Sequence, residues 1–176
     1  MTNRTLSILL VMVACAAAGL AQAPCTRYVA KDFSICQPAG WTVDTGENDA
    51  FKTVSGTAVG GQKANVVFSV DDLAMKLSDY VDATTKYTLE HVQDLGFTSI
   101  SLLGRSAVAT DTNESGVKST FQEEMKGTKL FGAQYIFDAG KKKLLVTFTT
   151  VDNERAANEK LFDDTIKTLK IDHSTP

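Results

Sequence analysis

Histidine, cysteine and clustered basic residues are scarce in this sequence. Its 176 residues include two histidines, three cysteines and one short lysine run, Lys141 to Lys143, and the net charge is −3. Phosphate backbones are bound by basic patches, so this composition excludes nucleic acid as a partner. The lysine run follows Gly140 between two apolar stretches, which predicts a solvated hairpin tip.

The sequence also lacks the motifs of common enzyme and cofactor sites. It has no GxSxG, no HExxH, no calcium-binding loop of EF-hand spacing and no GxGxxG followed by an acidic residue. The glycine-rich stretch at 56–62 carries no GK[ST] and follows no strand-then-helix pattern, so it is interpreted as a hairpin connection. We therefore expect no catalytic residue, no metal and no cofactor.

The N-terminus departs from the soluble composition of the rest. Arg4 precedes an apolar run from Leu6 to about Ala18, followed by small residues. The run is too short for a stable transmembrane helix and is typical of a secretory signal, which we place at residues 1–21, leaving 22–176 as the mature chain. Cleavage after Ala23 is an alternative. In a second interpretation "MVAC" is a lipobox, and a lipid on Cys15 would anchor the protein to a membrane.

The remaining cysteines, Cys25 and Cys36, support export. An even pair in an oxidising compartment usually forms a disulfide. Bonded cysteines need Cα atoms about 4.4–6.8 Å apart, so the chain must double back near residues 30–32 into two antiparallel arms. The rival interpretation, a redox-active or metal-binding pair, lacks CxxC spacing and a nearby histidine.

Hydrophobic periodicity predicts an α+β protein. Residues 64–70 and four later stretches, 97–104, 117–127, 129–138 and 143–151, have strand character, and short turns join the last four into an antiparallel meander. Residues 77–95 and 153–168 have helical periodicity. Both faces of 129–138 are partly apolar, which indicates a sheet covered by helices on both faces. No linker, repeat or second domain is evident, so 22–176 is expected to be a single domain.

This order of elements resembles the α/β/α sandwich of a superfamily that includes photosystem II protein PsbP, a Ran-binding nuclear import factor and DcrB-type bacterial envelope lipoproteins. The resemblance covers nearly the whole mature chain. It rests on Phe33, Ile35 and "PAGW" at 38–41, "LSDY" at 77–80, Gly104, "KKLLVTFTT" at 142–150 and "LFDDTIKTLKI" at 161–171. Export favours the bacterial envelope branch.

The "PAGW" stretch contains the only tryptophan and is interpreted as a structural turn. Pro38 presets φ for a turn, Gly40 permits a positive φ, and Trp41 would return a large apolar side chain to the sheet. A ligand-stacking role for Trp41 is the alternative.

Two polar residues are candidates for a ligand groove between sheet and helix. The helical wheel places His91 on the inner face of the first helix, where a buried neutral histidine or a ligand site are the two interpretations. Glu123 alternates with Phe121 and Met125 and would have a raised pKa if it were buried without a partner, although an edge position or a salt bridge also explains it.

The resemblance implies a non-enzymatic accessory or binding protein of the bacterial cell envelope, periplasmic or extracellular, that acts on an unidentified protein partner. The alternative is a small-molecule or metal-ion binding protein that uses the groove with His91 and Glu123. Contact with a membrane is expected only if Cys15 carries a lipid.

Overall fold

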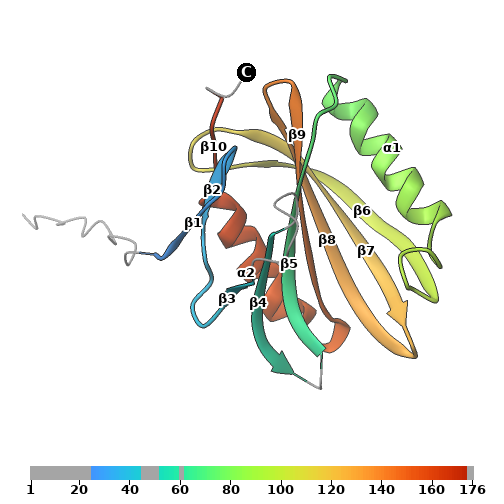
Figure 1. Cartoon of the computed structure of the whole chain (residues 1–176). Coiled ribbons are helices and arrows are strands. Elements are labelled where there is room, and N and C mark those ends of the chain that lie inside the picture. The colour runs from blue at the N-terminus through green and yellow to red at the C-terminus, as the bar shows by residue number, and fades with distance from the viewer. Residues whose placement is uncertain (1–24, 45–51, 60–61, 174–176) are drawn as a thin grey trace, which may run out of the picture.

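The computed structural model describes residues 25–44, 52–59 and 62–173, with side chains described outside 43–63 (Figure 1). The predicted signal segment 1–21 and Cys15 lie outside these residues, and both stay predictions. In the described part of the chain, no helix combines the length and the apolar character needed to cross a bilayer.

A seven-stranded antiparallel sheet forms the centre of the molecule, with the strand order β3-β4-β5-β9-β8-β7-β6. The strands are β3 (Thr42–Asp44), β4 (Lys52–Val59), β5 (Gln62–Asp71), β6 (Ser99–Ala109), β7 (Ser115–Met125), β8 (Thr128–Ala139) and β9 (Lys142–Val151). The predicted meander β6 to β9 is confirmed. Its β7–β8 and β8–β9 turns use Gly127 and Gly140, whose φ angles of +79° and +67° favour glycine.

A small three-stranded sheet lies beside the large one and is made of β1 (Arg27–Val29), β2 (Phe33–Cys36) and β10 (Lys170–Ile171). The chain doubles back between β1 and β2, and the Cys25–Cys36 disulfide closes the hairpin with Cα atoms 5.6 Å apart. Strand β10 follows α2 and pairs antiparallel with β2, which joins the end of the chain to the hairpin near its start.

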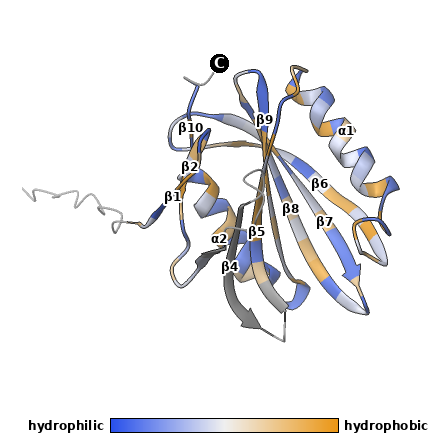
Figure 2. Ribbon diagram, viewed as in Figure 1, coloured by the Kyte–Doolittle hydropathy of each residue, from blue (hydrophilic) through white to orange (hydrophobic). Residues whose placement is uncertain are grey.

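Two helices cover opposite faces of the large sheet. They are α1 (Leu77–Glu90) and α2 (Arg155–Lys167), the latter preceded by a 3-10 turn, Asp152–Glu154. Successive side chains of a strand point to opposite faces, so Ile136 of β8 packs against α1, while Tyr135 and Phe137 belong to the core shared with α2. Figure 2 shows the resulting alternation of hydrophobic and hydrophilic residues along the strands of the sheet.

Most of the hydrophobic core lies on the α2 face. Phe148 of β9 stacks on Phe162 of α2 with ring centroids 4.4 Å apart and meets Tyr135 edge-on at 5.6 Å. The turn around Gly40, whose φ is +80°, is closed by a hydrogen bond from the Trp41 N–H to the Pro38 carbonyl. It places Trp41 edge-on to Phe162, so this turn contributes to the same core.

Candidate functional site

His91 and Glu123 occupy different environments. His91 follows the last residue of α1, Glu90, and its backbone is no longer helical (φ −112°, ψ 34°). Helical periodicity therefore ends before His91. Its ring stacks on exposed Tyr87 at 4.1 Å, and its Nδ1 lies 3.0 Å from the Tyr87 carbonyl oxygen. The interior position that the helical wheel predicts for His91 does not form.

Glu123 is buried on the α1 face of the sheet. Its carboxylate lies over Gly132 of β8, at a place where a Cβ on residue 132 would overlap it. The Oε2 atom is fully buried and has no hydrogen-bond partner. Burial raises the pKa of Glu123 to about 7. The side chain thus changes charge near neutral pH.

Other unpartnered polar atoms lie on the same side of the sheet. They are Thr85 Oγ1 on α1, Ser119 Oγ on β7 and Gln134 Oε1 on β8, and Ser119 lies directly opposite Gln134 in the strand register. A cavity of about 340 Å³ at the end of this face is lined by Phe97, Met125, Leu130 and residues of β5 and β9, and by neither His91 nor Glu123. Within the ranges that the structure describes, no group of three or more His, Cys, Asp or Glu side chains could hold a metal ion.

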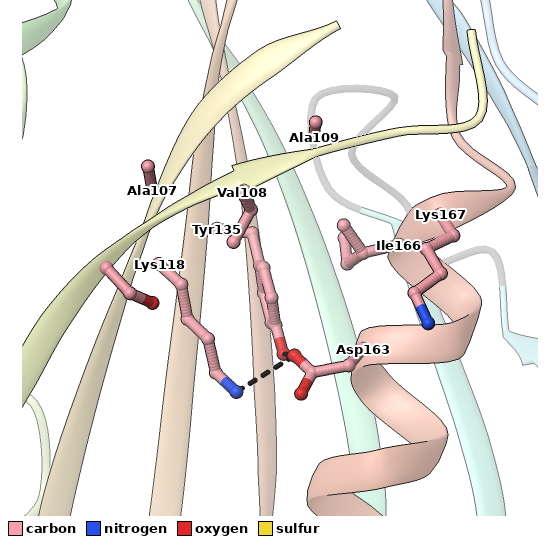
Figure 3. Close-up of a pocket in the computed structure, with 9 residues that line it drawn as sticks. Ala107, Val108, Ala109, Lys118, Tyr135, Asp163, Ile166 and Lys167 are labelled. Atoms are coloured by element: carbon pink, nitrogen blue, oxygen red, sulfur yellow. Dashed lines mark hydrogen bonds and ion pairs between the residues drawn. The ribbon is translucent and has the colours of Figure 1, made fainter. Parts of the chain in front are cut away.

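A charged network that the sequence did not reveal lies on the α2 face (Figure 3). Lys118 of β7 and Tyr135 of β8 are direct cross-strand neighbours, and Glu159 and Asp163 are one turn apart on α2. The buried Lys118 Nζ donates to Glu159 Oε1 at 2.9 Å and to Asp163 Oδ1 at 2.8 Å. The Tyr135 hydroxyl donates to the same Asp163 oxygen at 2.6 Å.

Electrostatics fix the charge states of this network. Burial, followed by the hydrogen bond and charge of Asp163, raises the pKa of Tyr135 far above its usual value. Burial alone would raise the pKa of Glu159, but hydrogen bonds and charges from Lys118 and Arg155 lower it. Tyr135 therefore stays protonated and Glu159 ionised near neutral pH. This arrangement suits the orientation of a bound group better than proton transfer.

A cavity of about 320 Å³ lies beside this network, between β6 and α2. Lys118, Tyr135, Asp163 and Lys167 supply its polar wall, and Ser106 to Ala109 of β6 supply the other side. Figure 3 shows Ala107 and Ala109 pointing away from the cavity, so these two residues border it with their backbone.

Exposed large hydrophobic residues concentrate on α1, its flanking segments and β6. Of eight such residues in the described ranges, seven lie between positions 73 and 103, and only Val29 lies elsewhere. We name the seven the α1–β6 apolar surface: Leu73, Met75, Tyr87, Leu89, Leu95, Leu102 and Leu103. An ion pair between Arg105 of β6 and Asp82 of α1, 2.5 Å apart, connects the two elements.

No protein-family model matches the sequence, and no curated protein matches it significantly. Solved structures match its fold. The cyanobacterial PsbP (CyanoP) of Synechocystis is 13% identical, with a TM-score of 0.61 over 89% of this chain and 98% of CyanoP. LpqN of Mycobacterium tuberculosis is 12% identical, with a TM-score of 0.59 over 86% of this chain and 87% of LpqN. The Ran-binding protein Mog1p of Saccharomyces cerevisiae is 9% identical, with a TM-score of 0.58 over 84% of this chain and 96% of Mog1p.

These likenesses extend over most of each chain. The expectation of an α/β/α sandwich is confirmed at the level of the fold. The chain therefore has the fold shared by PsbP and Mog1.

Proposed function

We propose that this chain is an exported, non-enzymatic binding protein of the bacterial cell envelope that acts on a protein partner. The observation that carries the proposal is the α1–β6 apolar surface. Large hydrophobic side chains gathered on one part of a surface mark sites of protein association, whereas scattered ones need no explanation. Seven of the eight described here fall on α1, its flanks and β6.

The proteins of the same fold support this class of function. LpqN is described as involved in cell envelope biogenesis, and Mog1p as a Ran-binding protein. The Cys25–Cys36 disulfide and the signal-like N-terminus support an oxidising, extracytoplasmic location. This support is an analogy of fold, and of the three proteins Mog1p is the one described as binding a partner.

The test is capture of a partner from envelope extract of the source organism by the immobilised mature chain. Leu102→Ser/Leu103→Ser removes two exposed leucines from the α1–β6 apolar surface. The control, Val29→Ser, removes an exposed aliphatic residue elsewhere, whose exposed fraction is 72%. We expect the double variant to lose a protein that the wild type and Val29→Ser both retain. Thermal unfolding checks that all three chains fold. Equal capture by all three folded chains would contradict the proposal.

A further inference from the structure

Strand β6 is the outermost strand of the large sheet and is eleven residues long. Among the described elements it pairs with β7 alone. Half of its backbone N–H and C=O groups therefore face outward, and no backbone hydrogen bond from another described segment reaches them. The strand at the opposite edge, β3, has only three residues. An exposed edge of this length is a template for a further strand.

The sequence of β6 does little to block such pairing. It contains no proline and one charged residue, Arg105, whose guanidinium is bound to Asp82. A bulge between Leu102 and Gly104 interrupts the register with β7, and beyond it Gly104–Ala109 pairs regularly. This second segment is the continuous part of the free edge.

The cavity between β6 and α2 lies beside that same segment, since Ser106 to Ala109 line it. A strand added along Gly104–Ala109 would direct alternate side chains toward the α2 face, where the cavity lies. The Asp163 side chain is 42% exposed, and its Oδ2 atom has no hydrogen-bond partner among the described residues. The cavity thus offers an acceptor to a hydrogen-bond donor.

We propose that Gly104–Ala109 of β6 binds an extended segment of the partner protein by strand addition, and that a hydrogen-bond-donating side chain of that segment enters the cavity beside Asp163. This inference rests on the proposed function and specifies its mode of binding. Main-chain hydrogen bonds along the edge provide affinity, and the cavity provides side-chain selectivity.

Two arguments favour an extended segment of another protein, rather than a second copy of this chain, as the occupant of the β6 edge. Only an extended polypeptide presents N–H and C=O groups at the spacing of a strand edge. A second copy of this chain, paired through the same segment, would direct only Gly104, Ser106 and Val108 toward the α2 face. These small side chains fill a cavity of about 320 Å³ poorly.

Single proline substitutions at positions 105 to 108 test the strand addition, with the capture assay and the melting temperature as readouts. Proline removes one N–H group. Where that N–H bonds to β7, we expect a lower melting temperature. Where it faces the open edge, we expect an unchanged melting temperature and about tenfold weaker capture, because a carbonyl of the partner loses its donor. The two effects should alternate along the strand.

A matched pair of variants tests the role of the cavity. Asp163→Asn weakens the acceptor in the cavity, whereas Asp164→Asn changes the neighbouring carboxylate, which pairs with Lys160 and Lys167. We expect weaker capture with Asp163→Asn alone. Its melting temperature should also fall, because Asp163 is a partner of the buried Lys118 ammonium, so capture is compared at a temperature at which both variants are fully folded. Equal capture by the two variants would overturn the role of the cavity.

Three outcomes overturn the strand addition. If the edge-facing proline variants capture normally while Leu102→Ser/Leu103→Ser does not, the partner docks on side chains, and the proposed function survives. If the wild type captures no protein, or if neither the edge-facing proline variants nor Leu102→Ser/Leu103→Ser lowers its capture, the proposed function fails as well. If sedimentation shows that the wild type alone dimerises and the edge-facing proline variants do not, the occupant is a second copy.

Discussion

The α2 face of the large sheet and the α1 face bury very different side chains. Among the described residues, the cluster on the α2 face contains seventeen buried hydrophobic residues, whereas the α1 face has five: Tyr80, Val81, Phe121, Leu130 and Ile136. Polar groups differ too. Lys118, Tyr135 and Asp163 satisfy one another on the α2 face, where the Tyr28 hydroxyl is the one unpartnered buried side-chain atom among the described residues. Four such atoms lie on the α1 face, one each on Thr85, Ser119, Glu123 and Gln134.

This difference indicates a division of roles. Close-packed apolar contacts supply most of the free energy of folding, so the α2 face and the small sheet packed on it hold the molecule together. Unpartnered polar atoms cost free energy, so the α1 face is held less firmly. Five of the seven residues of the α1–β6 apolar surface lie on α1 and its flanking segments, and so on the less firmly held side.

The largest expected effect comes from truncating one buried strand residue on each face. A leucine and an isoleucine are compared because their side chains are isomers. Leu144→Ala removes a fully buried residue of the α2 face, and Ile136→Ala removes one that is 1% exposed on the α1 face. Such truncations cost about 2–5 kcal/mol, and the cost grows with the cavity that remains. We expect the loss of unfolding free energy, measured by urea unfolding, to lie near the upper end of this range for Leu144→Ala and near the lower end for Ile136→Ala. Equal costs would remove the distinction between the faces.

A second prediction concerns the pH dependence of the unfolding free energy that results from the burial of Glu123. The folded-state pKa is about 7 and the ordinary value is 4.5, so the folded chain holds this proton more tightly than the unfolded chain. The stabilising effect of the proton is complete below about pH 4.5 and is lost as pH rises to about 7. The loss is about 3 kcal/mol for a shift of this size.

Unfolding free energies measured between pH 5 and 8 test this prediction. We expect stability to fall with pH in the wild type, and Glu123→Gln to remove that part of the slope. Phe121 and Leu130, its neighbours on this face, have no titratable group. The difference in slope between the wild type and Glu123→Gln therefore reports the titration of Glu123. A wild type and Glu123→Gln with the same slope would show that Glu123 finds a partner or water in solution.

The smallest expected effect concerns the connection between α1 and β6. The side chains of Arg105 and Asp82 are 33% and 71% exposed, and exposed ion pairs contribute less than about 1 kcal/mol. Arg105→Ala should therefore leave global stability almost unchanged. It should still speed amide hydrogen exchange in α1, because the helix has few other contacts with the β6 edge. Unchanged exchange would show that α1 is held by its other contacts, the apolar residues and the hydrogen bond from the Tyr80 hydroxyl to Asp71.

Much of the fold follows from residue patterns. The strand character of β5 to β9 was recognised, and the apolar residues on both sides of β8 predicted a sheet covered on both faces, which the structure has. Strands β3 and β4 were missed, since β4 reads KTVSGTAV, with small and polar residues and an internal glycine. The two-residue strand β10 carries no pattern of its own and forms only because β2 lies beside it.

The site was less predictable. The burial of Glu123 followed from alternation with Phe121, but its position over Gly132 depends on cross-strand register. His91 was placed by continuing a helix that ends at Glu90. The Lys118 network joins residues 41 and 45 positions apart, and such a distance in sequence carries no periodic signal.

The close approach of Glu123 to Gly132 also limits how this protein can evolve. A side chain at position 132 would have to displace this carboxylate, which is the far end of a flexible side chain. The effect of alanine at position 132 therefore depends on which residue occupies position 123, and substitutions at the two positions should be coupled.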